Sequence, residues 1–265
     1  GLRIMTMYPL ELLRGTWLIY RMHLGTVVGS RRTLAALVLA AAPVVITALA
    51  SNFGPDEVTG EMFFVNIGLI LAMGFSVPLL SVSLGVGVVA SEAEGRTITY
   101  PFTRPIPRAS LFLGRWLASL TLLVFLIGGC VLGMAMAADL RSPVPDGDVS
   151  RFLVACLMGV TVYSLGSAVI GTLFKRGLVI ALGYAFAIEV LLSIVPGSGR
   201  KLTLQHYLRS IFLEGRDGFF GIDENIATRF LIPADDAMFR LCLIAGVLVV
   251  IGTVTVSRKQ FVLSS

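Results

Sequence analysis

The sequence predicts an all-α integral membrane protein, and three observations lead to this fold class. Hydrophobic residues make up 56% of the 265 residues and charged residues only 14%, against roughly 45–50% and about 25% in soluble globular proteins. The mean hydropathy is +0.89. Apolar runs of about twenty residues recur along the chain, which is typical of membrane-spanning helices, whereas barrel strands would alternate over about ten residues.

Six apolar runs are long enough, or nearly so, to cross the membrane as helices, because the hydrocarbon layer is ~30 Å thick. We place them at residues 33–50, 63–90, 116–138, 151–173, 178–196 and 237–257. The second run is long and contains Pro78, so we expect a kink or a tilt there. The whole chain then forms one transmembrane domain, with the last helix and a cytoplasmic tail at 237–265.

The distribution of Lys and Arg predicts the orientation. With the N-terminus inside, 13 of the 21 basic residues fall in cytoplasmic segments, together with three of the 16 acidic ones. This asymmetry obeys the positive-inside rule, and the opposite orientation would break it. We therefore predict an N-in, C-in protein and attribute the net charge of +5 to topology rather than to nucleic-acid binding.

Residues 1–32 precede the first run and have a helical pattern of their own. One helical face holds Leu10, Leu13, Trp17, Tyr20 and Leu24. Pro9 suits a helix start, and Arg14 and Arg21 can reach lipid headgroups. We predict an interfacial helix on the cytoplasmic leaflet, with packing against the bundle as the alternative. The first run resembles a secretory signal, but the long segment before it favours a retained span.

The stretch 91–115, SEAEGRTITYPFTRPIPRASLFLGR, joins the second and third runs and contains three prolines and four arginines. The prolines prevent one continuous helix. We expect an acidic end after the second span, then a brief amphipathic helix that begins near Pro107, with Leu111 and Trp116 facing the membrane. A solvated loop would explain the arginines but not the acidic pair or the prolines, whereas a rigid projection suits docking into a partner's groove.

At these residues the sequence resembles the signature of the ABC-2 class of ABC transporter permeases. The usual form is acidic-x-acidic-x-G-T, a leucine-rich stretch, P-I-S-R and a later G-K. The matching positions are Glu92, Glu94, Gly95, Thr97, Pro105, Ile106, Arg108, Gly114 and Arg115. The departures are an inserted Arg96, Pro107 in place of serine, and Tyr100 and Pro101 in place of paired leucines. The resemblance covers essentially the whole chain, including the arrangement of the spans.

The resemblance implies a permease subunit in the bacterial inner (cytoplasmic) membrane. It would pair with a second copy or a paralogue and bind two cytosolic ATPase subunits, which hold the ATP and Mg²⁺. This chain would bind no cofactor or metal and would have no catalytic residue. The residues that couple it to the ATPases would be Glu92, Glu94, Gly95, Thr97, Arg104, Pro105 and Arg108. The resemblance leaves open the cargo, the choice between export and mechanical signalling, and an extracytoplasmic accessory protein.

The sequence offers little for catalysis by this chain alone. A Walker A loop needs a lysine directly after a glycine, and Lys175, Lys201 and Lys259 do not follow one. Cys130, Cys156 and Cys242 fall inside apolar runs without a CxxC spacing. We interpret these cysteines as packing residues rather than as metal ligands or disulfides.

Glu189 is the one acidic residue within a predicted span. A carboxylate there costs on the order of a few kcal/mol unless it is protonated, paired or hydrated. A pair with Arg240 or an interhelical hydrogen bond is the structural interpretation, and a transport-pathway residue is the functional one. An intramembrane enzyme or a proton-coupled secondary transporter that uses Glu189 is the alternative function. The enzyme would need a second convergent acid or base, and the transporter would need inverted repeats.

The segment 197–236 lies on the predicted outer side, before the last span. Its apolar side chains occur in clusters, which is unlike a polar linker. We expect short amphipathic or re-entrant helices there that cap the pathway. We place His206 of this segment at a polar surface rather than at a metal site.

Overall fold

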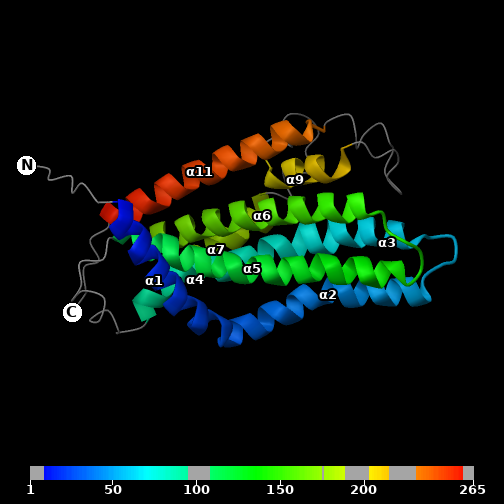
Figure 1. Ribbon diagram of the computed structural model, residues 1–265, viewed down its shortest axis with the longest axis horizontal. Coiled ribbons are helices and arrows are strands. Elements are labelled where there is room, and N and C mark those ends of the chain that lie inside the picture. Colours follow the sequence, from blue (N-terminus) through cyan, green and yellow to red (C-terminus); the bar gives the residue numbers. More distant parts are fainter. Residues whose placement is uncertain (1–8, 95–107, 175, 189–202, 215–230, 259–265) are drawn as a thin grey trace, which may run out of the picture.

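The computed structural model describes residues 9–94, 108–174, 176–188, 203–214 and 231–258. Of these residues 89% are helical and none lies in a β-strand, so the predicted all-α class is confirmed for the described part of the chain. Figure 1 shows the helices as an elongated bundle. Helix α1 crosses one end of the bundle, and α9 lies between α11 and α6 towards the other end.

The first two helices meet at a short turn. Helix α1 spans Pro9–Val28 and α2 spans Arg31–Phe53. The hydroxyl of Ser30 accepts a hydrogen bond from the Thr33 N–H at 3.3 Å. This N-cap satisfies one of the amide groups that every helix start leaves without a helical partner. Residues 9–28 therefore form a helix separate from the first span, as the sequence predicts.

The second predicted span is helical throughout but changes its helix type. It consists of α3, Gly60–Ile67, the π-helical segment η1, Gly68–Ser76, and α4, Val77–Glu94. Turns of π-helix are rare, and Pro78 has no N–H to donate to the turn before it. The span therefore changes helix type in the turns that precede the proline, and the expected kink or tilt stays a prediction.

The remaining helices follow in chain order. They are α5, Arg108–Asp139; α6, Asp146–Leu173; α7, Gly177–Leu182; the π-helical η3, Gly183–Ile188; α9, Leu204–Leu213; and α11, Ala234–Arg258. Helices α4, α5 and α6 pack on one another along the centre of the bundle, while α2 and α11 lie at its outside.

Five helices of the described chain are long and apolar enough to cross a membrane. They are Arg32–Phe53, Gly60–Gly87, Ala109–Asp139, Asp146–Leu173 and Ala234–Arg258. They correspond to the first four predicted runs and to the last. The fifth predicted run, 178–196, is described only to residue 188, where it forms the short apolar helix Gly177–Ala187. The rest of that run lies outside the described residues.

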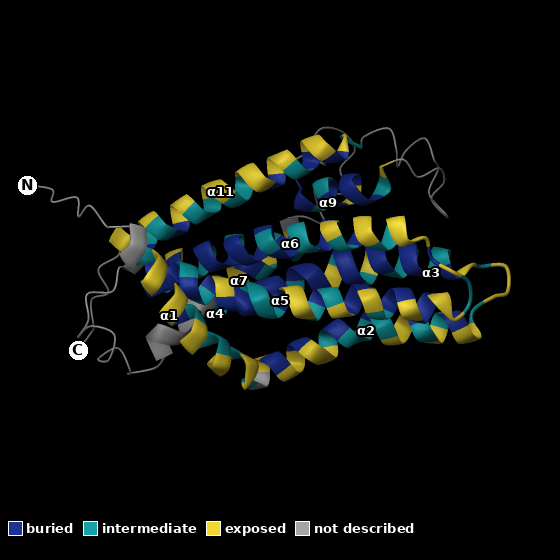
Figure 2. Ribbon diagram, in the orientation of Figure 1, coloured by how far each residue is buried: buried dark blue, intermediate teal, exposed yellow. Residues whose placement is uncertain are grey.

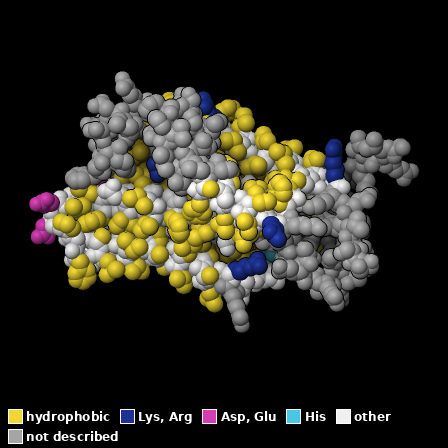
Figure 3. Space-filling view, turned by 180° about the vertical axis from the view of Figure 1, so that it is seen from behind, with side chains coloured by type: hydrophobic (Ala, Val, Ile, Leu, Met, Phe, Trp, Pro, Cys, Tyr) yellow, Lys and Arg dark blue, Asp and Glu magenta, His cyan; other side chains and the backbone are white. Residues whose placement is uncertain are grey.

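Charged side chains divide between the two ends of the bundle. The end where α2 meets α3 and α5 meets α6 holds the acidic residues whose side chains are described, and we call it the acidic end. They are Asp56, Glu57, Glu61, Asp139, Asp146, Asp148, Glu214, Asp235 and Asp236. Arg141 and Arg151 also lie there, while Glu11, Glu92 and Glu94 belong to α1 and α4 and lie towards the opposite end. The opposite end contains α1, and we call it the basic end; its described basic residues are Arg14, Arg21, Arg32, Arg115, Arg176 and Arg258. Figure 3 shows acidic side chains at one tip of the molecule, away from most of the basic ones.

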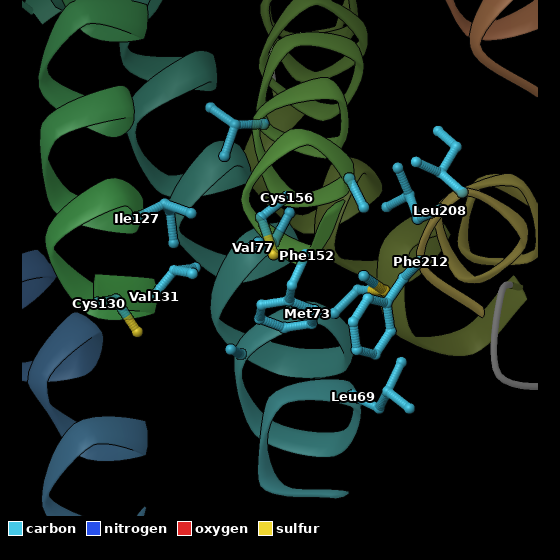
Figure 4. Packing of buried hydrophobic residues seen from close by; sticks show 14 of the residues in the cluster. Leu69, Met73, Val77, Ile127, Cys130, Val131, Phe152, Cys156, Leu208 and Phe212 are labelled. Atoms are coloured by element: carbon cyan, nitrogen blue, oxygen red, sulfur yellow. The ribbon is translucent and has the colours of Figure 1, made fainter. Parts of the chain in front are cut away.

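The core is built from side chains of η1, α4, α5, α6 and α9 (Figure 4). The Phe152 ring makes edge-to-face contacts with Phe64 and Phe212, at centroid distances of 5.3 and 4.9 Å, a geometry that aromatic pairs prefer. Cys130 and Cys156 are buried in this core as free thiols, whereas Cys242 is exposed on α11. Burial agrees with the interpretation of Cys130 and Cys156 as packing residues.

Helices α2 and α11 expose much of their apolar surface (Figure 2). On α11 the exposed large side chains are Phe239, Leu243, Val247, Val250, Ile251 and Val254. On α2 they are Leu34, Leu37, Val38, Val45, Ile46, Leu49 and Phe53. Exposure of that much apolar surface to water would be unfavourable, whereas lipid tails or other apolar helices can cover it. The protein therefore has the surface of a multi-pass membrane protein.

Helix α9 reaches from the acidic end into the middle of the bundle. Glu214 directly follows α9. Its backbone carbonyl oxygen accepts a hydrogen bond at 3.0 Å from Nη1 of Arg151, which lies close to the start of α6. Further in, a Cβ added to Gly159 would lie 2.8 Å from Leu208 Cδ1. Residue 159 is ~20 Å along α6 from Asp146, at 1.5 Å per residue. Helix α9 is thus a short helix packed inside the acidic half of the bundle, and the choice between the amphipathic and the re-entrant form stays a prediction because residues 189–202 and 215–230 lie outside the described residues.

His206 corrects one prediction, because it is buried rather than at a polar surface. The His206 side chain faces the bundle. The backbone N–H of His206 donates to the N-cap hydroxyl of Thr203 at 3.3 Å. The imidazole lies edge-to-face with the Tyr207 ring at 5.6 Å. Among the described residues, no group of three or more His, Cys, Asp or Glu is placed to hold a metal ion.

Arg141 joins the two turns at the acidic end. Its Nη1 donates to Ser51 O and Gly54 O, both at 3.1 Å, and its Nη2 donates to Pro55 O at 2.5 Å. The guanidinium carbon also lies 5.6 Å from the centroid of the Phe63 ring. The last carbonyls of a helix have no helical donor. Arg141 therefore caps α2 from the turn between α5 and α6.

We predict that Arg141→Lys lowers the free energy of unfolding by about 2 kcal/mol, the loss expected for hydrogen bonds to a charged group. A lysine keeps the charge but offers one nitrogen, whereas the planar guanidinium reaches the carbonyls with two. Thermal unfolding in lipid nanodiscs measures the change. Arg258→Lys, in the last turn of α11, is the matched control and should leave stability unchanged. Equal melting temperatures for Arg141→Lys and the native chain would contradict the capping role.

Candidate coupling site

The structure brings α1 and the start of α5 into contact at the basic end. Ser110 Oγ donates to Leu12 O at 3.1 Å. Further along both helices, the hydroxyl oxygens of Tyr20 and Thr121 lie 3.3 Å apart. The N-terminal helix is therefore docked along the third span by hydrogen bonds at both ends of their contact.

The two helices approach so closely because Gly114 has no side chain. A Cβ on Gly114 would lie 2.7 Å from Thr16 O and 2.9 Å from Ile19 Cβ. Thr16 and Ile19 are both buried between the helices. Gly114 is one of the positions that match the permease signature, and the structure gives it a physical role: it lets the backbones of α1 and α5 touch.

The opposite face of α1 is apolar and exposed. Leu13, Trp17 and Met22 are each more than 60% exposed, and the Trp17 ring stacks on Tyr20 at 5.4 Å. Arg14 lies on the same helix and is also exposed. Helix α1 thus has both features that the sequence left as alternatives: one face packs on the bundle, and the other has the apolar and basic side chains of an interfacial helix.

His23 is a site residue that the sequence did not single out. It is half-buried near the end of α1. Burial and, to a smaller extent, the nearby positive charge of Arg115 together lower the pKa of the His23 imidazole from 6.5 to about 4. The imidazole is therefore neutral at physiological pH, and no charge beside Arg115 opposes the docking of α1.

The ends of the predicted coupling loop flank this site. Glu92 and Glu94 lie in the last turn of α4, and Arg108 is the first residue of α5. The side chains of these three residues are not among those described. Also outside the described residues are Gly95, Thr97, Arg104 and Pro105. The structure thus places the two edges of the loop at the basic end, and the contacts of the loop itself stay predictions.

The start of α5 corrects the predicted shape of this region. The helix begins at Arg108, directly after Pro107 as expected, but it continues without a break to Asp139 and is not a brief separate helix. Trp116 is buried rather than facing the membrane, and its Nε1–H donates to Ser164 Oγ of α6 at 3.1 Å. The indole needs a hydrogen-bond acceptor when it is buried, and α6 supplies one.

Helices α4 and α6 are also in close backbone contact. A Cβ on Gly85 would lie 2.8 Å from Ser164 O, and Ser167 Oγ donates to Ser81 O of α4 at 3.1 Å. Small residues let membrane helices pack in this way. Together with Trp116, these contacts connect α4, α5 and α6 below the predicted loop.

The predicted partner of Arg240 falls outside the described residues. Arg240 itself is exposed on α11, towards the acidic end. Glu189 follows η3 directly and is not described. The Glu189–Arg240 pair and the pathway role of Glu189 therefore stay predictions.

Comparison with known proteins adds no family to this picture: no protein-family model matches the chain, and no curated protein is significantly similar to it.

We predict that Gly114→Ala displaces α1 from α5, because the added Cβ would lie within 3 Å of both Thr16 and Ile19. Overpacking of this kind costs about 1–3 kcal/mol. Gly128→Ala, on the same helix with nothing within 4 Å of the new Cβ, is the matched control. Limited proteolysis at the turn between α1 and α2 measures the change, with faster cleavage expected for Gly114→Ala alone. Unchanged cleavage in both variants would contradict the close approach.

The lowered pKa of His23 predicts that the packing of α1 on α5 weakens in acid. An unfolded chain protonates histidine near pH 6.5, while folded His23 takes up its proton only near pH 4. Unfolding therefore binds a proton between these values, and the stability of the docked helix falls as the pH drops through this window. Histidine NMR titration of the native chain should give a pKa near 4 for His23. Arg115→Gln should raise this pKa only in part, since burial is the larger cause; a pKa near 6.5 in the native chain would contradict the docked position.

Proposed function

We propose that this chain is the membrane-spanning permease subunit of an ABC transporter of the ABC-2 class. In this proposal it has six spans, both termini are cytoplasmic, and it resides in a bacterial inner membrane. It assembles with a second copy or a paralogue and with two cytosolic ATPase subunits. The chain has no nucleotide site of its own, and ATP and Mg²⁺ belong to the partner ATPases.

One observation supports the proposal: the two helix ends that flank the signature stretch lie together at the basic end of the bundle. The stretch from Glu92 to Arg108 begins in the last turn of α4 and ends at the first residue of α5. Both helix ends belong to the basic end, beside α1 (Figure 1). A basic end on the cytoplasmic side and an acidic end outside would follow the positive-inside rule.

The contacts at the basic end suggest how such a subunit would work. Nucleotide-driven closure of the ATPases would push on the loop after α4 and on α1. Because α1 touches α5 at Gly114 and Trp116 binds Ser164 of α6, the push would move these helices together. The bundle would then change between inward-facing and outward-facing arrangements, each stabilised by its own set of contacts.

The proposal is tested by reversing the charge of both glutamates, Glu92→Lys with Glu94→Lys, in the full chain. We predict that the tagged variant loses its co-purifying ATPase, or retains it with ATP hydrolysis at least tenfold less dependent on the permease. The physical reason is that a cluster of basic residues on the partner would meet like charge. The measurement is ATPase stoichiometry and turnover after purification from native membranes.

The matched control is Asp235→Lys with Asp236→Lys, an exposed acidic pair at the start of α11 and at the acidic end. This control should keep both the ATPase and its coupling. If the native chain brings down no protein with nucleotide-hydrolysing activity, or if the two double variants behave alike, the proposed function is wrong.

A further inference from the structure

The π-helical segment of the second span creates a carbonyl group that the helix cannot satisfy. At the end of η1 the Val77 N–H donates to Ala72 O, five residues back. In the same register the next donor, to Met73 O, would be residue 78. Residue 78 is proline and has no N–H. Met73 O is therefore left without a donor from its own helix.

Helix α9 supplies the missing donor. Gln205 Nε2 donates to Met73 O at 2.9 Å, across 132 positions of the sequence. Met73 is fully buried, so water is not at hand to take the place of the amide. Within the described residues, the other end of this amide, Gln205 Oε1, is shielded from solvent and has no hydrogen-bond partner. The bond to Met73 is thus the hydrogen bond that holds the Gln205 side chain in place.

The identity of the unsatisfied carbonyl depends on the helix register. In an α-helical register Val77 would donate to Met73 O, four residues back, and the proline would instead leave Gly74 O without a donor. Gln205 is placed at Met73. Its amide therefore stabilises the π register and offers nothing to the same span in the α register.

We propose that Gln205 is a latch by which helix α9 holds the second span in its π-helical register. When α9 withdraws Gln205, the segment Gly68–Ser76 relaxes towards an α-helix and α4 turns about its axis. The last turn of α4 contains Glu92 and Glu94, so a movement of α9 near the acidic end reaches the basic end. The latch does not require a partner ATPase, and its test is independent of the proposed function.

The first test is a double-mutant cycle on the full chain in nanodiscs. Gln205→Leu should lower the melting temperature, because Met73 O is then buried without a donor. Pro78→Ala restores an N–H at residue 78 that can donate to Met73 O in the π register, so the loss caused by Gln205→Leu should shrink to less than half in that background. If Gln205→Leu fails to accumulate, Pro78→Ala should restore its accumulation. An equal loss in both backgrounds, or no rescue, would overturn the latch.

Asn66→Leu is the matched control in the same span. Asn66 Nδ2 also donates to a backbone carbonyl, Met62 O at 2.9 Å, but this carbonyl lies in regular α-helix. The decrease in melting temperature caused by Asn66→Leu should not depend on Pro78. Coupling of Asn66→Leu to Pro78→Ala as strong as that of Gln205→Leu would overturn the assignment.

The second test follows the position of α4 by spin-label distances, in a Cys242→Ser background with labels at Ser83 and Met136. Gln205→Leu should shift this distance distribution, because α4 turns relative to α5. A reference pair at Met62 and Met136, with Met62 in α3 and outside the segment that changes register, should keep its distribution. An unchanged Ser83–Met136 distribution in a folded Gln205→Leu variant would overturn the proposal.

Discussion

Every backbone N–H and C=O group inside a bilayer must find its partner within the protein, because lipid tails offer none. The irregular points of this fold are the places where that constraint is met by a side chain from elsewhere. Arg141 supplies donors to the last carbonyls of α2, and Gln205 supplies one to the carbonyl that Pro78 leaves unsatisfied in η1. Each of these hydrogen bonds joins segments that are far apart in the sequence, so a bond that satisfies a backbone carbonyl is also a tertiary contact.

Close approach at glycines is the second organising feature, and it occurs at both ends of the bundle, at Gly60 beside Ala138 O as well as at the basic end. Gly114 lets α1 touch α5, Gly85 lets α4 touch α6, and the Phe112 ring of α5 lies against Gly252 of α11. Side chains at these positions would hold the helices apart. Interiors packed in this way transmit displacement with little internal give. The basic end is therefore a stiff assembly of four spans and a docked surface helix, which is what a mechanical input requires.

The sequence predicts the helices better than it predicts their neighbours. Apolar runs of spanning length identify five helices that the structure shows to be long and apolar enough to cross a membrane, since length and hydropathy are local properties. Trp116 and His206 were placed at surfaces but are buried, because helix periodicity alone does not say which side of a helix faces another helix. The π register of η1 was beyond sequence reasoning for the same cause: its stabilising donor, Gln205, lies in another helix. Of the candidate site, the signature glycine at Gly114 was found by pattern, while its contact with Thr16 needed the structure.

A stiff basic end and an adjustable second span complement each other. If every span were regular α-helix packed through glycines, a push at the basic end could only translate the bundle as one body, and nothing could change at the acidic end. A segment with two accessible registers provides the missing degree of freedom, since it lets α4 turn while α3 stays capped and packed. Helix α9 contacts that segment at Met73 and also α6 at Gly159. Helix α9 therefore couples the arrangement of the acidic end to the helix register of the second span.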